Sequence, residues 1–225
     1  MQPPHHNPAL RGWRGLIGLD MIRYNPVMAT APAIQDEAGV SFPSYAGLRM
    51  TADEYLALED DGRKYELVNG VVVVSPSPTT KHQQVMGEIL YQVMAFLRAN
   101  PLGSVYAETD VRMAGDLVYR PELVFIRAER VRANWPRISE PPDLVVEVVS
   151  PESRRYDAET KRSDYERYGV REYWLIDPDL EAMTFLRLDG SAYVPIQPQG
   201  DELASAVLPG FKLDLKAVRA SFQPL

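Results

Sequence analysis

The chain has 225 residues, of which 45% are hydrophobic and 24% charged, a composition typical of a globular domain with a substantial core. Its formal net charge of −7 argues against a general, high-affinity nucleic-acid binder, but it leaves room for an enzyme with a local basic groove. The chain has no cysteine, which excludes disulfides and thiolate metal sites. No apolar run approaches the ~20 residues of a membrane span, and no signal peptide is recognisable. We therefore expect a cytoplasmic protein without a membrane partner.

We expect three parts in the chain: a flexible N-terminal arm over residues 1–48, one folded domain over 49–218 and a short tail over 219–225. Prolines punctuate the arm, and no helical or strand period lasts there for more than a turn. The adjacent histidines His5 and His6 lie in the arm, where such a pair is more often incidental than a metal site.

The first half of the domain predicts helix, hairpin and helix. A short helix is expected over residues 51–58, because Thr51 and the acid three residues later have the spacing of a capping box. A β-hairpin is expected over residues 64–75, where Asn69-Gly70 predicts a type I′ turn between two apolar strands. A long helix is expected to begin at residue 79 or 80 and to end near residue 99.

The second half predicts strands around one buried central strand. The run Asp143–Ser150 is nearly continuous in apolar, β-branched residues, which favours a strand covered on both faces in an α/β sheet. A helix over residues 157–168, ended by Gly169, is expected to follow it. Pro121 marks the beginning of a strand over residues 117–126, or an irregularity in it, because proline removes one ladder donor. The other expected strands cover residues 105–108, 111–113, 172–177, 183–188 and 193–196, and the segment 208–215 closes the domain.

A loop rich in arginine precedes the central strand. Arg132 and Arg137 flank Trp135 in this loop, and arginine mixed with an aromatic residue suits phosphate contact and base stacking. A solvated loop in which Trp135 covers an apolar patch explains the same pattern equally well.

Three glutamates and one lysine are the candidates for chemistry: Glu66, Glu122 and Glu147 on separate strands, and Lys161 on the helix after Glu147. A lone buried carboxylate is costly, so such a residue is usually paired, hydrogen-bonded or bound to a metal. Carboxylates from neighbouring strands suit Mg²⁺, which takes hard oxygen ligands, polarises a phosphate and lowers the pKa of its bound water. A nearby lysine can orient the attacking water and stabilise negative charge. Spacing alone is weak evidence, because the chain contains 31 acidic residues.

Two further residues are candidate accessories of this site. His82 falls in the first turn of the helix over residues 79–99, where it could contact a phosphate or a metal-bound water, although capping or packing is the more common role. Tyr165 lies four residues after Lys161 and shares its helix face.

Several motifs carry a resemblance to a known family. They are Tyr65-Glu-Leu-Val-Asn-Gly70, Ser75-Pro76 with His82, Pro121-Glu122, the run Pro142-Asp-Leu-Val-Val-Glu-Val-Val-Ser-Pro151, the set Asp157, Lys161 and Tyr165, and Glu172-Tyr-Trp-Leu-Ile-Asp-Pro178. From Met50 to about Leu215, about three quarters of the chain, the sequence resembles the Uma-two family of endonucleases in the PD-(D/E)XK restriction-endonuclease-like superfamily.

The resemblance implies an α/β fold with a restriction-endonuclease-like core, a central mixed β-sheet flanked by helices, and extra β-hairpins. It places the acid of the proline-acid motif at Glu122 and the second motif acid at Glu147, and it matches Glu66 to an additional acid. It implies Mg²⁺ or Mn²⁺ as cofactor, held by these three glutamates, and DNA as substrate.

The sequence departs from the superfamily pattern at two positions. The usual aspartate after proline is Glu122 here, one methylene longer, which would shift a bound metal. The usual lysine two residues after the second acid is replaced by Val149, so Lys161 would have to reach the site from the following helix, as the family resemblance implies.

We interpret the chain as a metal-dependent endonuclease that hydrolyses phosphodiester bonds in DNA. The alternative is a catalytically inactive nuclease-fold module that binds protein or nucleic acid. A glycoside hydrolase with paired carboxylates is disfavoured, because no aromatic-rich run suggests a sugar cleft. A homodimer is left open.

Overall fold

The computed structural model describes residues 34–35, 41–42, 44–75, 77–133, 135 and 137–223. The expected flexible arm, His5 and His6 included, therefore lies almost entirely outside the described residues. Within that part of the sequence, β1 (Ile34–Gln35) pairs antiparallel with β2 (Ser41–Phe42).

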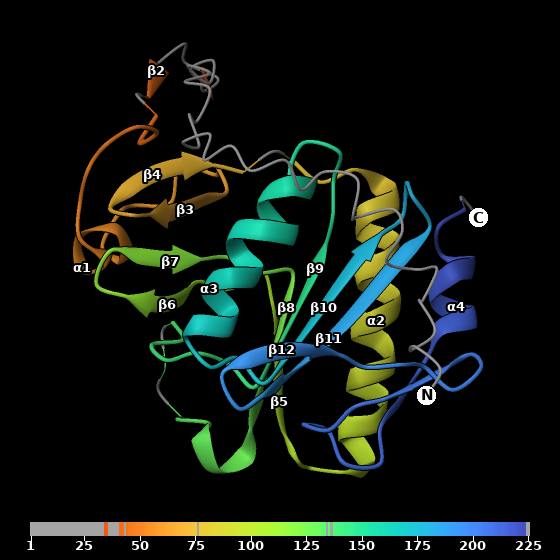
Figure 1. Ribbon diagram of the computed structural model, residues 1–225. Coiled ribbons are helices and arrows are strands. Elements are labelled where there is room, and N and C mark those ends of the chain that lie inside the picture. The colour runs from red at the N-terminus through yellow and green to blue at the C-terminus, as the bar shows by residue number, and fades with distance from the viewer. Residues whose placement is uncertain are drawn as a thin grey trace, which may run out of the picture.

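The main body is a mixed six-stranded sheet in the order β12-β11-β10-β9-β8-β5 (Figure 1). Its strands are β5 (Gly103–Ala107), β8 (Leu123–Arg127), β9 (Leu144–Val148), β10 (Glu172–Asp177), β11 (Ala182–Asp189) and β12 (Ala192–Pro195). Strands β9 and β10 run parallel, while the other neighbouring pairs are antiparallel. The prediction of a mixed α/β sheet with a central strand at residues 144–148 is confirmed.

A second, four-stranded sheet in the order β4-β3-β7-β6 lies beside the first. Its strands are β3 (Tyr65–Val68), β4 (Val71–Val74), β6 (Val111–Ala114) and β7 (Leu117–Tyr119), and α1 (Ala52–Leu56) packs on it. Asn69 and Gly70 have φ values of 50° and 73°, the positive values that a type I′ turn requires, so the predicted hairpin is confirmed. The capping box of Thr51 with Glu54 is also present.

Helices cover both faces of the six-stranded sheet (Figure 1). The long α2 (Thr80–Ala99) and the short α4 (Leu215–Ala220) cover one face, and α3 (Arg162–Arg167) covers the other. The smaller elements are a 3₁₀ turn (Ala128–Arg130) and the pair β13 (Glu202–Ala204) and β14 (Lys212–Asp214). Among the described residues no helix is long and apolar enough to cross a bilayer.

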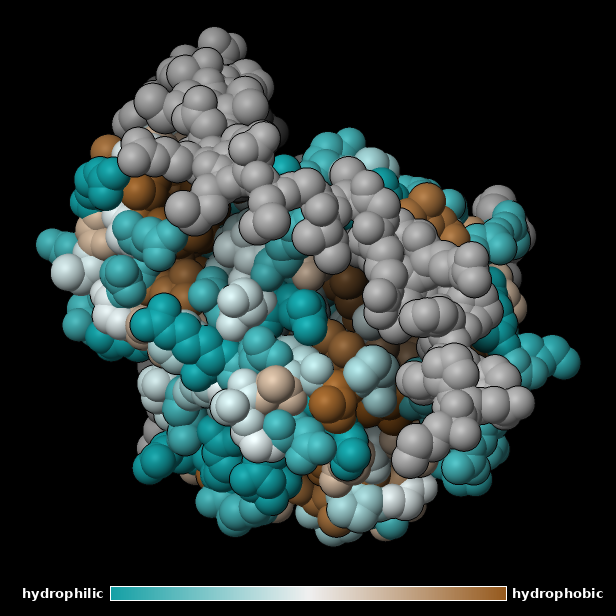
Figure 2. Space-filling model, viewed as in Figure 1, coloured by the Kyte–Doolittle hydropathy of each residue, from teal (hydrophilic) through white to brown (hydrophobic). Residues whose placement is uncertain are grey.

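Strand β9 is buried on both faces because its side chains alternate between two cores. Leu144, Val146 and Val148 face the core under α2, whereas Val145 and Val149 face the core under α3. Glu147 therefore points to the α3 side. Figure 2 shows that the molecular face carrying α3 is mostly hydrophilic, with apolar side chains only in small separate groups.

Two predicted elements differ from the structure. The strand expected over residues 117–126 is two strands in different sheets, because Arg120-Pro121-Glu122 carries the chain from β7 to β8. The helix expected over 157–168 begins at Arg154 and includes a π-helical segment, Tyr156–Lys161, before α3. The backbone hydrogen bond of a π turn spans one more residue than that of an α turn, and such turns are frequent at functional sites.

The folded unit extends beyond both expected domain boundaries. Gly47 donates its N–H to the Val72 carbonyl and Val72 donates to Leu48, so the chain already follows β4 before residue 49. The boundary expected at residue 218 falls inside α4, and Phe222 is buried in the main core.

Candidate active site

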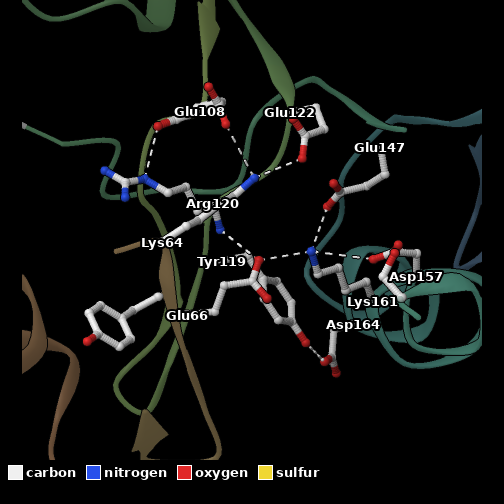
Figure 3. Close-up of polar contacts among 12 residues, drawn as sticks. Lys64, Glu66, Glu108, Tyr119, Arg120, Glu122, Glu147, Asp157, Lys161 and Asp164 are labelled. Atoms are coloured by element: carbon white, nitrogen blue, oxygen red, sulfur yellow. Dashed lines mark hydrogen bonds and ion pairs between the residues drawn. The ribbon is translucent and has the colours of Figure 1, made fainter. Parts of the chain in front are cut away.

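A cavity of about 830 Å³ lies where the two sheets meet, and it contains all four residues expected to carry the chemistry. Its walls come from the β3–β4 hairpin, the first turn of α2, the end of β9 and the π-helical segment. Glu66, Glu122, Glu147 and Lys161 all line it (Figure 3). The topology explains why the three glutamates lie close together, because each of them is on or beside a strand that ends where the two sheets meet.

Glu147 is held by two donors from the helix above it. The Tyr165 hydroxyl donates to Glu147 Oε1 at 2.8 Å, and the Lys161 ammonium donates to the same oxygen at 3.1 Å. The side chain is only 2% exposed, and this burial raises the pKa of the Glu147 carboxyl, while Lys161 opposes the rise.

Lys161 is surrounded by carboxylates. Its Nζ lies 2.9 Å from Glu66 Oε1 and 3.5 Å from Asp157 Oδ1, in addition to Glu147. The rings of Tyr119 and Tyr156 each lie 5.4 Å from the same nitrogen. Burial works to lower the pKa of the Lys161 ammonium, but the three carboxylates hold that pKa well above its ordinary value. Lys161 is therefore protonated at neutral pH.

Glu66 lies on β3, and its contacts with the protein are made by the oxygen that faces Lys161. Its Oε1 accepts a hydrogen bond from the backbone N–H of Arg120 at 3.0 Å and forms an ion pair with the Lys161 ammonium. Like Glu147, Glu66 thus has two protein groups at its Oε1 atom.

Glu122 follows Pro121 in the connection between the two sheets, rather than within a strand. Its Oε1 accepts from the Lys64 ammonium at 2.8 Å, and the Nε2 atom of His82 lies 3.5 Å away. Its Oε2 is buried and has no hydrogen-bond partner within the described residues. Burial raises the pKa of Glu122, and burial lowers the pKa of His82, with Lys64 acting in the same direction on His82.

The structure adds two residues that the sequence analysis did not assign to the site, Lys64 and Asp157. Lys64 is two residues before Glu66, and residues at this spacing in an extended chain share one face, so the spacing was an available signal. Asp157 is four residues before Lys161, and burial raises the pKa of Asp157 to about 7.

The cluster contains more acids than cations. Four buried carboxylates (Glu66, Glu122, Glu147 and Asp157) share two lysines, so the fully ionised cluster would carry an excess of negative charge. In the described part of the chain no three histidine or acidic side chains are grouped as metal ligands. Mg²⁺ needs only one or two carboxylates, with waters and phosphate oxygens completing its shell. Glu122, whose Oε2 has no hydrogen-bond partner within the described residues, and the nearby Glu147 therefore fit a hard divalent cation.

A comparison with models of protein families identifies the family of the chain. The model named Uma2, described as "Putative restriction endonuclease", matches residues 52–216. The chain belongs to the Uma2 family. The matched segment runs from α1 into α4, so it includes every residue of the cavity cluster.

A solved structure supports the fold of this Uma2 chain. The crystal structure of "a putative nuclease belonging to DUF820" from Anabaena variabilis ATCC 29413 superposes with a TM-score of 0.67. It is 18% identical and covers 77% of this chain and 99% of its own. No curated protein matches the sequence. The restriction-endonuclease-like fold expected from the sequence is confirmed, and the chain is a member of a nuclease-type family.

The arginine-rich loop of the Uma2 chain lies away from the cavity. Neither arginine nor Trp135 lines it. Arg132 lies over the Trp135 ring at 5.8 Å and within 3.5 Å of Glu140, while Arg137 lies 3.5 Å from Asp110. Trp135 packs against the α3-side core. The structure thus does not bring these residues together with the acids, and its contacts favour the interpretation of a loop that packs on its own domain.

Proposed function

We propose that this chain is a divalent-cation-dependent nuclease that hydrolyses phosphodiester bonds in DNA. The observation that carries the proposal is the cavity cluster itself, where protein donors hold one oxygen of each glutamate and leave Glu122 Oε2 open. The family description "Putative restriction endonuclease" supports DNA as the substrate.

In the proposed site, Glu122 and Glu147 bind Mg²⁺ or Mn²⁺, and Glu66 supports them from β3. The cation, when bound, polarises the phosphate and lowers the pKa of a coordinated water. Hydrolysis forms a bond from the water oxygen to phosphorus and breaks the bond from phosphorus to one sugar oxygen, which receives the proton. The protein residues orient the groups for this step.

The roles of the remaining residues follow from their contacts. Lys161 fixes the facing oxygens of Glu66 and Glu147 and keeps a positive charge beside them. Tyr165 holds Glu147 Oε1 from the same helix. His82 is neutral and packs beside Glu122, where its buried Nδ1 has no hydrogen-bond partner among the described residues.

The test measures cleavage and metal binding separately. Wild-type protein should cleave plasmid or single-stranded DNA only with Mg²⁺ or Mn²⁺, and its melting temperature should rise with either ion, because an ion that binds only the folded state stabilises it. Glu147→Gln keeps the shape of the side chain but removes its charge. This variant should lose at least about 10²-fold in cleavage, the scale of one lost electrostatic stabiliser, and most of the metal-induced melting shift.

Glu172→Gln provides the matched control. Glu172 is a fully buried glutamate on the neighbouring strand β10, but it bonds to Ser205 and Ala206 outside the cavity. This variant should keep its metal-induced shift and its cleavage per folded molecule. A wild-type protein that neither cleaves DNA nor responds to the ions would favour the inactive nuclease-fold module.

A further inference from the structure

Three lysines line the cavity, and two of them, Lys64 and Lys161, contact its buried glutamates in different surroundings. A lysine ammonium has three N–H donors and no acceptor. Lys161 has three carboxylate neighbours (Glu66, Glu147 and Asp157) at 2.9, 3.1 and 3.5 Å, and two tyrosine rings flank it. Protein groups therefore surround its ammonium, and its side chain is only 7% exposed.

Lys64 has donor capacity left over. Its Nζ bonds Glu122 Oε1 at 2.8 Å, while its second carboxylate, Glu108, lies at 3.6 Å and is 39% exposed. The Lys64 side chain is 18% exposed and lines the cavity. Figure 3 shows its ammonium between Glu108 and Glu122, on the side of the cluster opposite to Asp157. At least one N–H of Lys64 is thus free to meet a ligand within the cavity.

The pKa of Lys64 is consistent with a permanent cation. Burial works to lower the pKa of the ammonium, but Glu122 and Glu147 together raise that pKa above its ordinary value. Lys64 therefore presents a positive charge next to Glu122, whose buried Oε2 has no hydrogen-bond partner within the described residues. This is the place where a phosphate oxygen and the metal-holding acids of the proposed site would meet.

We infer that Lys64 is the lysine that contacts a non-bridging oxygen of the scissile phosphate, and that Lys161 is a positioning residue that acts through Glu66 and Glu147. The inference rests on the proposed function and assigns a substrate-binding role to a residue outside the motif pattern. It differs from the expectation that Lys161 itself orients the attacking water and stabilises negative charge.

The experiment compares Lys64→Ala with Lys64→Arg and with a surface control, Lys212→Ala, whose lysine is 59% exposed and pairs with Glu202. Binding of a fluorescent single-stranded oligonucleotide is measured by anisotropy with Ca²⁺ in place of Mg²⁺, and cleavage is measured with Mg²⁺. Lys64→Ala should weaken binding by about tenfold, the scale of one charge-assisted hydrogen bond, and should lower kcat by about 10²-fold. Lys64→Arg should restore most of the binding, because it keeps the charge.

Lys161→Met supplies the contrast, since this variant should lose thermal stability, whereas Lys64→Ala should lose oligonucleotide binding without a comparable loss of stability. Melting curves show whether Lys161→Met folds. If it does not fold, the Lys64 variants still test the inference. The inference is overturned where wild type cleaves DNA and Lys64→Ala binds and cleaves equally well. It is also overturned where Lys64→Ala loses activity only through unfolding. Failure of the proposed function is a different result, in which wild type itself does not cleave.

Discussion

The two ends of strand β9 carry buried acids in opposite surroundings. Asp143, just before the strand, is fully buried and lies within 2.9 to 3.6 Å of three arginines, Arg127, Arg130 and Arg171. It also accepts the backbone N–H of Arg127. Glu147, four residues later, shares one lysine with two other acids.

The two ends of β9 show how a buried charge that only stabilises the fold differs from one that belongs to a binding site. A buried carboxylate with an excess of cations needs no added ligand or proton to be stable. The Asp143 cluster therefore has a structural role, in which it joins β8, β9 and the loop before β9. A buried cluster with an excess of acids is stable only with added positive charge or bound protons. The Glu147 end therefore has the character of a binding site, and the predictions that follow test this contrast.

The largest expected effect is the loss of stability in Lys161→Met. This substitution leaves Glu66, Glu147 and Asp157 buried with no cation between them, and breaking a buried pair in this way costs about 3–5 kcal/mol, or about 10 °C in melting temperature for a domain of this size. Urea denaturation at neutral pH measures the loss. Part of it should be recovered at pH 5, because the acids then take up protons; an equal loss at both values would contradict the electrostatic explanation.

Asp143→Asn should also destabilise the protein, by about 2–3 kcal/mol, somewhat less than a fully buried pair. The cost is lower because its arginine partners are 24% to 55% exposed and can turn to water. Cleavage per folded molecule should stay unchanged, since Asp143 does not line the cavity. Loss of activity in a folded Asp143→Asn protein would show that the two ends of β9 are coupled.

The third prediction concerns pH. The folded-state pKa of Asp157 is about 7 against an ordinary value of 3.8, so the metal-free folded protein binds more protons than the unfolded chain between these values. The contribution of Asp157 to stability therefore falls as the pH rises from about 4 to about 7. A pKa difference of one unit is worth about 1.4 kcal/mol. The free energy of unfolding, measured for wild type and Asp157→Asn across this pH window, should fall more steeply with pH for wild type. Parallel curves would show that Asp157 is not part of the coupled cluster.

The smallest expected effect distinguishes two N-terminal truncations. A protein beginning at Ser44 should melt within about 2 °C of the full chain. Beginning at Arg49 should cost about 1–3 kcal/mol more, because it removes the two hydrogen bonds of Gly47 and Leu48 to β4, each worth about 0.5–1.5 kcal/mol. The contact between the rings of Tyr45 and Tyr65 at 5.7 Å is lost as well. Equal stability of the two truncations would place the true boundary at residue 49.

Much of the fold was predictable because its signals are local. The Asn69-Gly70 turn, the cap at Thr79 and the apolar run of β9 each depend on a few adjacent residues. The split of residues 117–126 was not predicted, since both halves are apolar and only their partners in different sheets distinguish them. The π-helical segment also gives no periodic signal distinct from an α-helix over so few residues.

The site was predicted only in part, because only some of its residues give a local signal in the sequence. Glu122, Glu147 and Lys161 stand out because a charge beside or within an apolar element is costly. Lys64 stands at the exposed-looking start of a hairpin, and nothing local reveals that it reaches Glu122, 58 residues away. Which oxygen of each acid is occupied depends entirely on tertiary contacts.

The placement of the site across two sheets has a consequence for cooperativity. Lys64 and Glu66 belong to the small sheet, which shares one core with the larger body but has a second, small core of its own, built mainly from α1, β3, β4 and β7. Glu147 and Lys161 belong to the larger body. Units with small cores of their own can open at a lower free energy than the whole molecule. Low concentrations of denaturant should therefore inactivate the protein before the six-stranded sheet melts, and hydrogen exchange in the β3–β4 hairpin should follow the loss of activity. The strand amides of β9 and β10 should stay protected until global unfolding.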